Sequence, residues 1–176
     1  MDPHAYAWSA RERQLYIDGK IEFPRKYKIK TQDSADLRLE LEELLETLPQ
    51  KDLATWAIQN SKDFLKYIDI DDESLKESII IEASKALEER IEAKLSAHQL
   101  RQAGFLANKL SQQSINDVSK FSARVFAQAV AVGHMRRHAI VSSDYAIKVV
   151  NILYPHDEQA VLKEREKQIQ LAKTFL

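Results

Sequence analysis

Chemically reactive side chains are concentrated between Gly133 and Val150, in the stretch GHMRRHAIVSSDYAIKVV. The candidates are His134, Arg136, Arg137, His138, Ser142, Ser143, Asp144 and Tyr145. His134 and His138 are four residues apart, a spacing that would place both imidazoles on one face of a helix and could bind zinc. However, HMRRH lacks the glutamate of the metalloprotease motif, and no third ligand shares the spacing. The stretch therefore predicts no metal site and no cofactor.

The same stretch contains serine, histidine and aspartate, the residue types of a hydrolase triad. Neighbours in sequence rarely reach the geometry that a nucleophile and its base require, and the stretch has no Gly-x-Ser-x-Gly turn. Helix capping explains the serines more simply, so we predict that Ser142 or Ser143 begins the helix that carries Tyr145. The preceding helix is then expected to end between Arg136 and Ala139. We interpret the stretch as a corner between two helices rather than as the active site of an enzyme.

The predicted corner also assigns roles to its other polar side chains. His138 would lie in the turn, and both His134 and His138 would bond backbone carbonyls near a helix end, where positive charge is favoured. Ser143 and Asp144 would satisfy polar groups of the turn. Arg136 and Arg137 are candidates for contact with a partner.

The elements that must position this corner are predicted to be helices. Apolar residues recur at helical spacing from Ser34 onward, and no segment shows sustained strand alternation. Only three Gly and four Pro occur, whereas a sandwich or barrel needs frequent tight turns. We predict a compact all-α fold of about seven or eight helices with short loops and no sheet. Its single core should contain Trp56, Phe64, Phe121, Phe126, Val149 and Leu153.

Two helix starts and one break depend on local signals. Asp71 or Asp72 is expected to cap the helix that follows, and Ser114 with Asp117 resembles a capping box. Whether a break occurs near Ser96–His98 is left open. The chain is interpreted as one globular domain, with residues 1–30 forming an N-terminal helix and basic connector and residues 31–176 forming the helical domain.

Charge and composition restrict the function classes. The net charge is −1, which gives no support to a nucleic-acid binder as a whole. The chain has no Cys, which excludes disulfides and thiolate catalysis. The N-terminus lacks the pattern of a signal peptide, and no apolar run approaches the ~20 residues that a membrane helix needs. We therefore expect a cytoplasmic protein without membrane contact.

Two segments could nevertheless contact nucleic acid. The basic stretch Lys20–Lys30 could bind phosphates, although a solvated connector explains it more simply. The stretch SINDVSKFSARVFAQAV resembles a helix-turn-helix start, but its apolar periodicity continues without a break and favours one long helix.

Three segments together resemble the immunity proteins of bacterial polymorphic toxin systems, of the Imm-five-like type. They are LATWAIQNSKDFL, ESIIIEASKALEERI and, most clearly, SARVFAQAVAVGHMRRHAIVSSDYAIKVV. The resemblance extends from about Leu53 to Leu153, and its positions are Ala127, Ala129, Ala131, His134, His138, Ala139, Tyr145 and Ala146. Ser142, Ser143 and Asp144 depart from the small residues common there, and the first thirty or so residues have no counterpart.

The resemblance implies a small helical cytoplasmic protein, not an enzyme, that binds and neutralises a cognate toxin protein. It carries over no catalytic residues. The expected contact faces are the charged sides of Asp36–Glu46 and Glu82–Lys94, together with Arg136 and Arg137. The alternative is a helical nucleic-acid-binding or regulatory module that uses Lys20–Lys30 and Arg136–Arg137. The identity of the toxin and the oligomeric state do not follow from the sequence.

Overall fold

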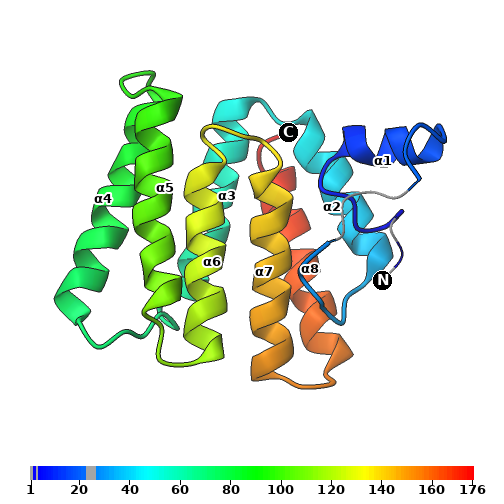
Figure 1. The fold of residues 1–176 in the computed structure, drawn as a ribbon. Helices are drawn as coiled ribbons and strands as arrows, with labels where there is room; N and C mark the ends of the chain where they lie inside the picture. Colours follow the sequence, from blue (N-terminus) through cyan, green and yellow to red (C-terminus); the bar gives the residue numbers. More distant parts are fainter. Residues whose placement is uncertain (1, 3, 23–26) are drawn as a thin grey trace.

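The computed structural model describes residues 2, 4–22 and 27–176, and they form an all-helical fold (Figure 1). Within these residues eight helices occur, and the only strand-like pairing is an isolated antiparallel bridge between Ile70 and Ser114. The helices are α1 (Ala10–Ile17), α2 (Ala35–Thr47), α3 (Gln50–Leu65), α4 (Glu73–Ile91), α5 (Ala97–Gln112), α6 (Asp117–Ala131), α7 (His138–Leu153) and α8 (Glu158–Lys173). The predicted all-α class, with seven or eight helices and no sheet, is confirmed.

Helices α6 and α7 form the centre of the molecule because both bury small and apolar side chains around most of their surface. Helices α3 and α5 pack against α6, and α4 lies beyond α5 at one end of the fold (Figure 1). Helices α2 and α8 pack against each other beyond α7, and the short α1 lies against α2. The segment SINDVSKFSARVFAQAV contains one continuous helix from Asp117, as the periodicity predicts.

The buried apolar side chains form more than one cluster, which corrects the prediction of a single core. Trp56 and Phe126 belong to the largest cluster, whereas Phe64 and Val149 belong to a second one, with Phe121 and Leu153 packed partly buried against it. Tyr145 contacts both clusters. The division runs along α7, because Ala139, Ile140 and Val141 near its start belong to the largest cluster and Ala146 and Val149 further along belong to the second.

Most helix starts follow the capping signals. Asp72 caps α4 by accepting a hydrogen bond from the backbone N–H of Leu75, and Ser96 forms a capping box with Gln99, so the chain does break between α4 and α5. The predicted capping box of Ser114 with Asp117 is wrong. Asn116 caps α6 instead, because the hydroxyl of Ser114 donates to the carbonyl of Leu110 in the preceding helix.

The N-terminal segment is less helical than predicted. Helix α1 begins only at Ala10, capped by Ser9, and Pro3 lies outside the described residues. In the basic stretch Lys20–Lys30, residues 23–26 also lie outside them, but the described end of this stretch packs on the fold, with Ile29 buried in the largest cluster. Across the described ranges, no helix is both long enough and apolar enough to cross a membrane.

Candidate functional site

The corner between α6 and α7 has a different geometry from the predicted one. Helix α7 begins at His138, so Ser142 and Ser143 lie inside the helix and neither caps it. The position before the helix is Arg137, which makes no side-chain capping bond. Both serines are buried, and each hydroxyl donates to a backbone carbonyl, Ser142 to Val125 and Ser143 to Ile140, with donor–acceptor distances of 2.7 Å. A serine hydroxyl can bond a backbone carbonyl inside a helix as well as an N–H group at a helix start. The two serines therefore did not indicate where α7 begins.

The two histidines face each other across this corner, with ring centroids 5.2 Å apart. A bond of 2.6 Å joins Nδ1 of His138 to Oε1 of Gln128, so the expected partner, a backbone carbonyl, is replaced by a side-chain amide. His138 lies at the start of α7 and not at the end of a helix. Positive charge is unfavourable at a helix start. Burial, with His134 and Arg137 nearby, lowers the pKa of His138 to about 4. Among the described residues no group of three or more metal-ligating side chains occurs.

The two arginines of the corner hold neighbouring elements together. Nη2 of Arg136 donates to the carbonyls of Leu45 and Leu48, at 3.0 and 2.8 Å, and so bonds the end of α2. The guanidinium of Arg137 lies 5.7 Å from the ring centroid of Trp8. Both side chains are half-buried. The corner therefore connects α2 and the N-terminal segment to the centre of the fold.

Tyr145 lies apart from the histidines, on the face of α7 that packs against α6. Its ring stacks on that of Phe121, with centroids 6.1 Å apart, and the guanidinium of Arg124 lies 5.7 Å from its centroid. Tyr145 therefore has a packing role next to the second cluster.

Asp144 is the centre of a buried ionic network that the sequence did not predict. Its carboxylate accepts hydrogen bonds from Nε and Nη2 of Arg38 on α2, at 3.0 and 2.9 Å, and from Nη2 of Arg165 on α8, at 2.6 Å. The hydroxyl of Tyr27 donates to it as well. Burial alone would raise the pKa of Asp144, but Arg38 and Arg165 beside it hold the pKa below its ordinary value.

The network continues into the N-terminal segment. Arg38 also donates to the backbone carbonyl of Ala5 at 2.6 Å and pairs with Glu42, which pairs in turn with Arg13 on α1. Arg165 donates to both carboxylate oxygens of Asp33, at 3.0 and 2.6 Å. Its members are three arginines and three carboxylates, Arg13, Arg38, Arg165, Asp33, Glu42 and Asp144, so the formal charges balance.

The sequence did not predict five of these six members, because charged residues on amphipathic helices and in connecting segments are normally solvent-exposed. The one available signal was the spacing of Arg38 and Glu42, four residues apart on the apolar side of α2 between Leu37, Leu41 and Leu45.

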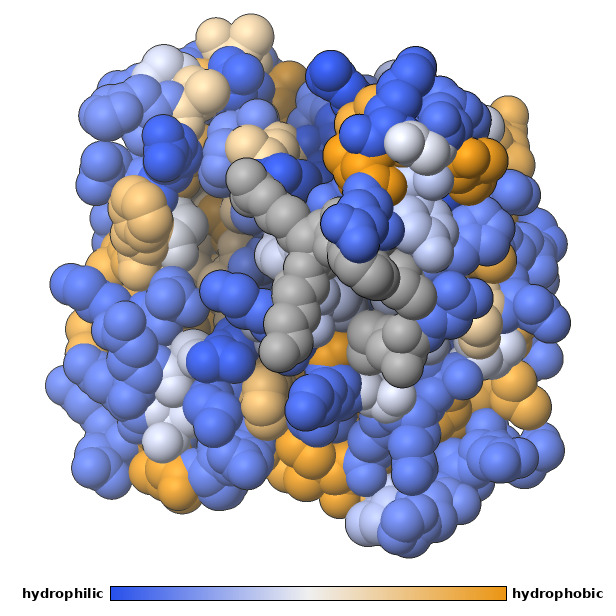
Figure 2. All heavy atoms as spheres, turned by 45° about the vertical axis from the view of Figure 1, so that its right-hand side comes forward, coloured by the Kyte–Doolittle hydropathy of each residue, from blue (hydrophilic) through white to orange (hydrophobic). Residues whose placement is uncertain are grey.

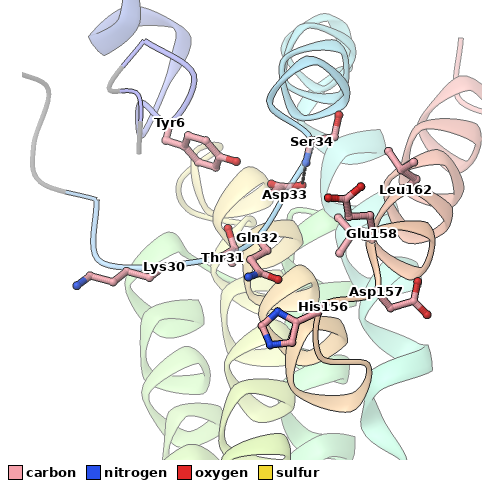
Figure 3. A pocket seen from close by; sticks show the side chains of 11 residues that line it. Tyr6, Lys30, Thr31, Gln32, Asp33, Ser34, His156, Asp157, Glu158 and Leu162 are labelled. Carbon is pink, nitrogen blue, oxygen red and sulfur yellow. Dashed lines mark hydrogen bonds between the residues drawn. The ribbon is translucent and has the colours of Figure 1, made fainter.

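A cleft of about 870 Å³ lies above one end of this network, between residues 30–34 and the start of α8 (Figure 3). Asp33 and Tyr6 line it on the side of the N-terminal segment, and His156, Glu158 and Leu162 line it on the other side. The face of the molecule around the N-terminal segment is largely hydrophilic, with apolar side chains scattered over it (Figure 2).

A second hollow lies at the opposite end of the fold, between α4 and α5. This groove, of about 530 Å³, has an apolar floor and a charged rim. Its lining side chains are Glu82, Lys85, Ala86, Glu89, Leu95, Gln99, Gln102, Ala103, Phe105, Leu106 and Lys109. Phe105 is 60% exposed at its edge.

A family model described as "Imm-5 like putative immunity protein" matches residues 43–175. The chain belongs to this immunity protein family. No curated protein and no solved structure matches the chain. The match confirms the resemblance and extends it beyond Leu53–Leu153 in both directions, into α2 and through α8.

In this member of the Imm-5 like family, the two hollows differ in their relation to the matched region. The α4–α5 groove lies wholly inside residues 43–175. The cleft of Figure 3 is divided, because α8 belongs to the matched region whereas Tyr6 and residues 30–34 precede it. Asp144 and Arg165 are inside the match, and their partners Arg38 and Asp33 precede it.

Proposed function

We propose that this protein is a cytoplasmic immunity protein that binds a cognate toxin domain and neutralises it by protein–protein interaction, without a catalytic step. The observation that carries this proposal is the family match over residues 43–175. The contacts of the serine, histidine and aspartate side chains that were considered as a hydrolase triad support a non-catalytic role. Ser142 and Ser143 donate to backbone carbonyls, His138 bonds Gln128, and Asp144 bonds two arginines.

The outer face of α4 and α5 is the surface that best fits a protein partner. It combines the apolar floor of the groove, the exposed ring of Phe105 and rim charges of both signs. Aromatic side chains beside an apolar depression are typical of the residues that dominate binding energy. The charged side of Glu82–Lys94, expected from the sequence to contact the toxin, includes the α4 rim of this groove, Glu82, Lys85 and Glu89.

The charged side of Asp36–Glu46 is retained as a second contact face, but with fewer side chains. Arg38 and Glu42 belong to the buried network, so the face consists of residues such as Glu43 and Glu46. Arg136 and Arg137 contribute to toxin binding indirectly, because they stabilise the corner between α6 and α7. A specific interface of about 1,600 Å² would need more than one helix, which α4 and α5 together provide.

Co-expression tests the proposal. Cells that produce the cognate toxin domain should survive when the wild-type protein is present and die when it is absent. Phe105→Asp should abolish protection while leaving the circular dichroism spectrum and melting temperature near those of the wild type, because Phe105 is exposed. Ile17→Asp, a matched change at a side chain that is 54% exposed on α1, should protect fully. Death of cells that carry the wild-type protein at normal abundance would contradict the proposal.

The nucleic-acid alternative has less support from the described contacts. Arg136 is bonded to the carbonyls of α2, and Lys30 extends from a segment whose backbone is bonded by Lys148. Phosphate binding weakens steeply with salt because counterions are released. A salt-dependent gel shift with generic DNA or RNA would favour this alternative over the toxin.

A further inference from the structure

The cleft above Asp33 combines an apolar wall with polar groups that face it from both sides (Figure 3). Val161 and Leu162, on the first turns of α8, form the apolar wall. Residues 30–34, which are extended before α2, form the opposite side. A long side chain with an apolar stem and a polar end would match this division.

Three carboxylates line the cleft, those of Asp33, Asp157 and Glu158, and their environments differ. Asp33 is fully engaged, since Arg165 donates to both of its oxygens and the backbone N–H of Ser34 donates to Oδ1. Glu158 is exposed, and among the described residues it has no hydrogen bond and no ion pair. In Figure 3 its carboxylate is directed toward Asp33 across the cleft rather than away from the protein. Glu158 therefore contributes a negative charge that no ion pair within residues 2, 4–22 and 27–176 neutralises.

The hydroxyl of Tyr6 is a second polar group that lacks a partner. Tyr6 is only 8% exposed, and its ring is fixed by the guanidinium of Arg38, 4.8 Å from the centroid, and by the ring of Tyr27 at 6.1 Å. The side chain points into the cleft (Figure 3), and no described residue bonds its hydroxyl. Burial, with Asp33 and Asp144 nearby, raises the pKa of Tyr6, so the hydroxyl stays protonated and can both donate and accept.

The charges around the cleft select a cation as its ligand. The start of α8 would attract an anion, but Asp157 already bonds the backbone N–H of Ala160 and Glu158 adds a second negative charge in the first turn. Lys30 extends away from Glu158 at the far side of the cleft (Figure 3). Hydrogen bonds from a cation to a carboxylate are stronger than those between neutral groups.

We propose that this cleft binds a basic side chain, arginine or lysine, presented by a polypeptide segment. The ammonium or guanidinium donates to the carboxylate of Glu158 and to the hydroxyl oxygen of Tyr6, and the aliphatic stem lies against Val161 and Leu162. The identification of this polypeptide as the toxin rests on the proposed function. The preference of the cleft for a basic side chain does not depend on it. The cleft would add a contact at the opposite end of the molecule from the α4–α5 groove.

Peptide titration of the full-length, ¹⁵N-labelled protein tests the cleft without any toxin. The probes are acetylated, amidated Gly-Arg-Gly and Gly-Lys-Gly, with the neutral arginine isostere citrulline and with glutamate as controls. The two basic peptides should cause saturable shifts of the amide signals of residues 30–34 and 158–162. Glu158→Gln should weaken this binding about tenfold and Tyr6→Phe about threefold, while Glu166→Gln, at an exposed position elsewhere on α8, should leave it unchanged.

The citrulline and glutamate peptides should cause no saturable shifts. The proposal is overturned if the basic peptides do not bind, if citrulline binds as tightly as arginine, if glutamate binds more tightly, or if Glu158→Gln has no more effect than Glu166→Gln. Failure of the wild-type protein to protect cells from the toxin would contradict the proposed function alone, because the peptide titration would still report on the cleft.

Discussion

The carboxylate of Asp144 stabilises two buried arginines in the folded protein. A buried ion pair gains from mutual attraction and from satisfied hydrogen bonds, but removal of one partner leaves a charge in a medium that solvates it poorly. Arg38 and Arg165 both lack solvent contact, and both bond Asp144. The carboxylate therefore compensates charges contributed by two different helices.

Asp144→Ala is expected to reduce the free energy of unfolding by about 3–5 kcal/mol, because it leaves two buried guanidinium groups short of one negative charge. Urea unfolding followed by circular dichroism measures the change. The comparison is Asp63→Asn, which removes the exposed pair with Lys167 and should cost less than about 1 kcal/mol. Equal costs for the two variants would mean that the network contributes no more than a surface pair.

His138 predicts a pH dependence of stability. Its pKa is about 4 in the folded protein and about 6.5 in the unfolded chain. Between these values the unfolded chain binds a proton that the folded protein excludes, so stability should fall as the pH decreases from about 6.5 to about 4, by on the order of 2 kcal/mol. Asp144, whose folded pKa is lowered, loses its contribution only as the pH falls further.

The urea midpoint measured across this pH range tests the assignment. His138→Gln removes the titrating group and should flatten the slope between pH 6.5 and 4, leaving the smaller part that His134 contributes through its own lowered pKa. An unchanged slope in His138→Gln would show that other groups cause the dependence.

At the scale of elements, the approach of the α6–α7 corner to α4 and α5 depends on Gly133. A Cβ atom there would collide with Leu100 and would come within 2.7 Å of Cδ1 of Leu87. Both leucines are fully buried and have little room to move. The carbonyl of Gly133 also accepts a hydrogen bond of 3.2 Å from Nε of Arg90 on α4.

Two alanine substitutions of glycine should therefore have opposite effects. Gly133→Ala should destabilise the protein by about 1–3 kcal/mol through overpacking. Gly104→Ala, inside α5 where a Cβ meets nothing within 4 Å, should stabilise it by about 0.5–1 kcal/mol, because alanine restricts the unfolded chain. Thermal unfolding measures both, and a neutral Gly133→Ala would contradict the close packing of the corner.

The sequence predicts elements well where a local signal fixes them. Asp72 begins a helix because its carboxylate accepts a hydrogen bond from the backbone N–H of Leu75, and the unbroken periodicity from Asp117 identifies α6 as one helix. The start of α7 was misplaced because Ser142 and Ser143 have the same local preferences in a turn and in a buried helix. The network could not be predicted, because Arg38 and Arg165 reach Asp144 only after α2, α7 and α8 have packed. Asp33 joins the network through Arg165.

At the scale of the whole molecule, the network connects the N-terminal segment to the helices. Arg38 bonds the carbonyls of Ala5 and Ala7, and Glu42 on α2 pairs with Arg13 on α1. A segment held by buried charged groups should not separate from the fold without exposing them. We therefore expect residues 1–30 and 31–176 to unfold as one unit.

The two tryptophans can report on this coupling because Trp8 belongs to the N-terminal segment and Trp56 to the largest cluster. In Trp8→Phe and Trp56→Phe, the fluorescence of the remaining tryptophan should change at the urea concentration where circular dichroism of the same variant reports loss of helix. Coincident transitions indicate a single cooperative domain. An earlier transition for Trp8 would show that the N-terminal segment unfolds independently.

The central claim is that this protein neutralises a toxin by forming a complex with it. The most direct test purifies the cognate toxin domain and measures its activity while this protein is added. The claim predicts that the activity falls in proportion to the added protein until the two are present in a fixed ratio, and that a complex of the same ratio elutes from size exclusion. Full toxin activity in the presence of a large molar excess of folded protein would contradict it.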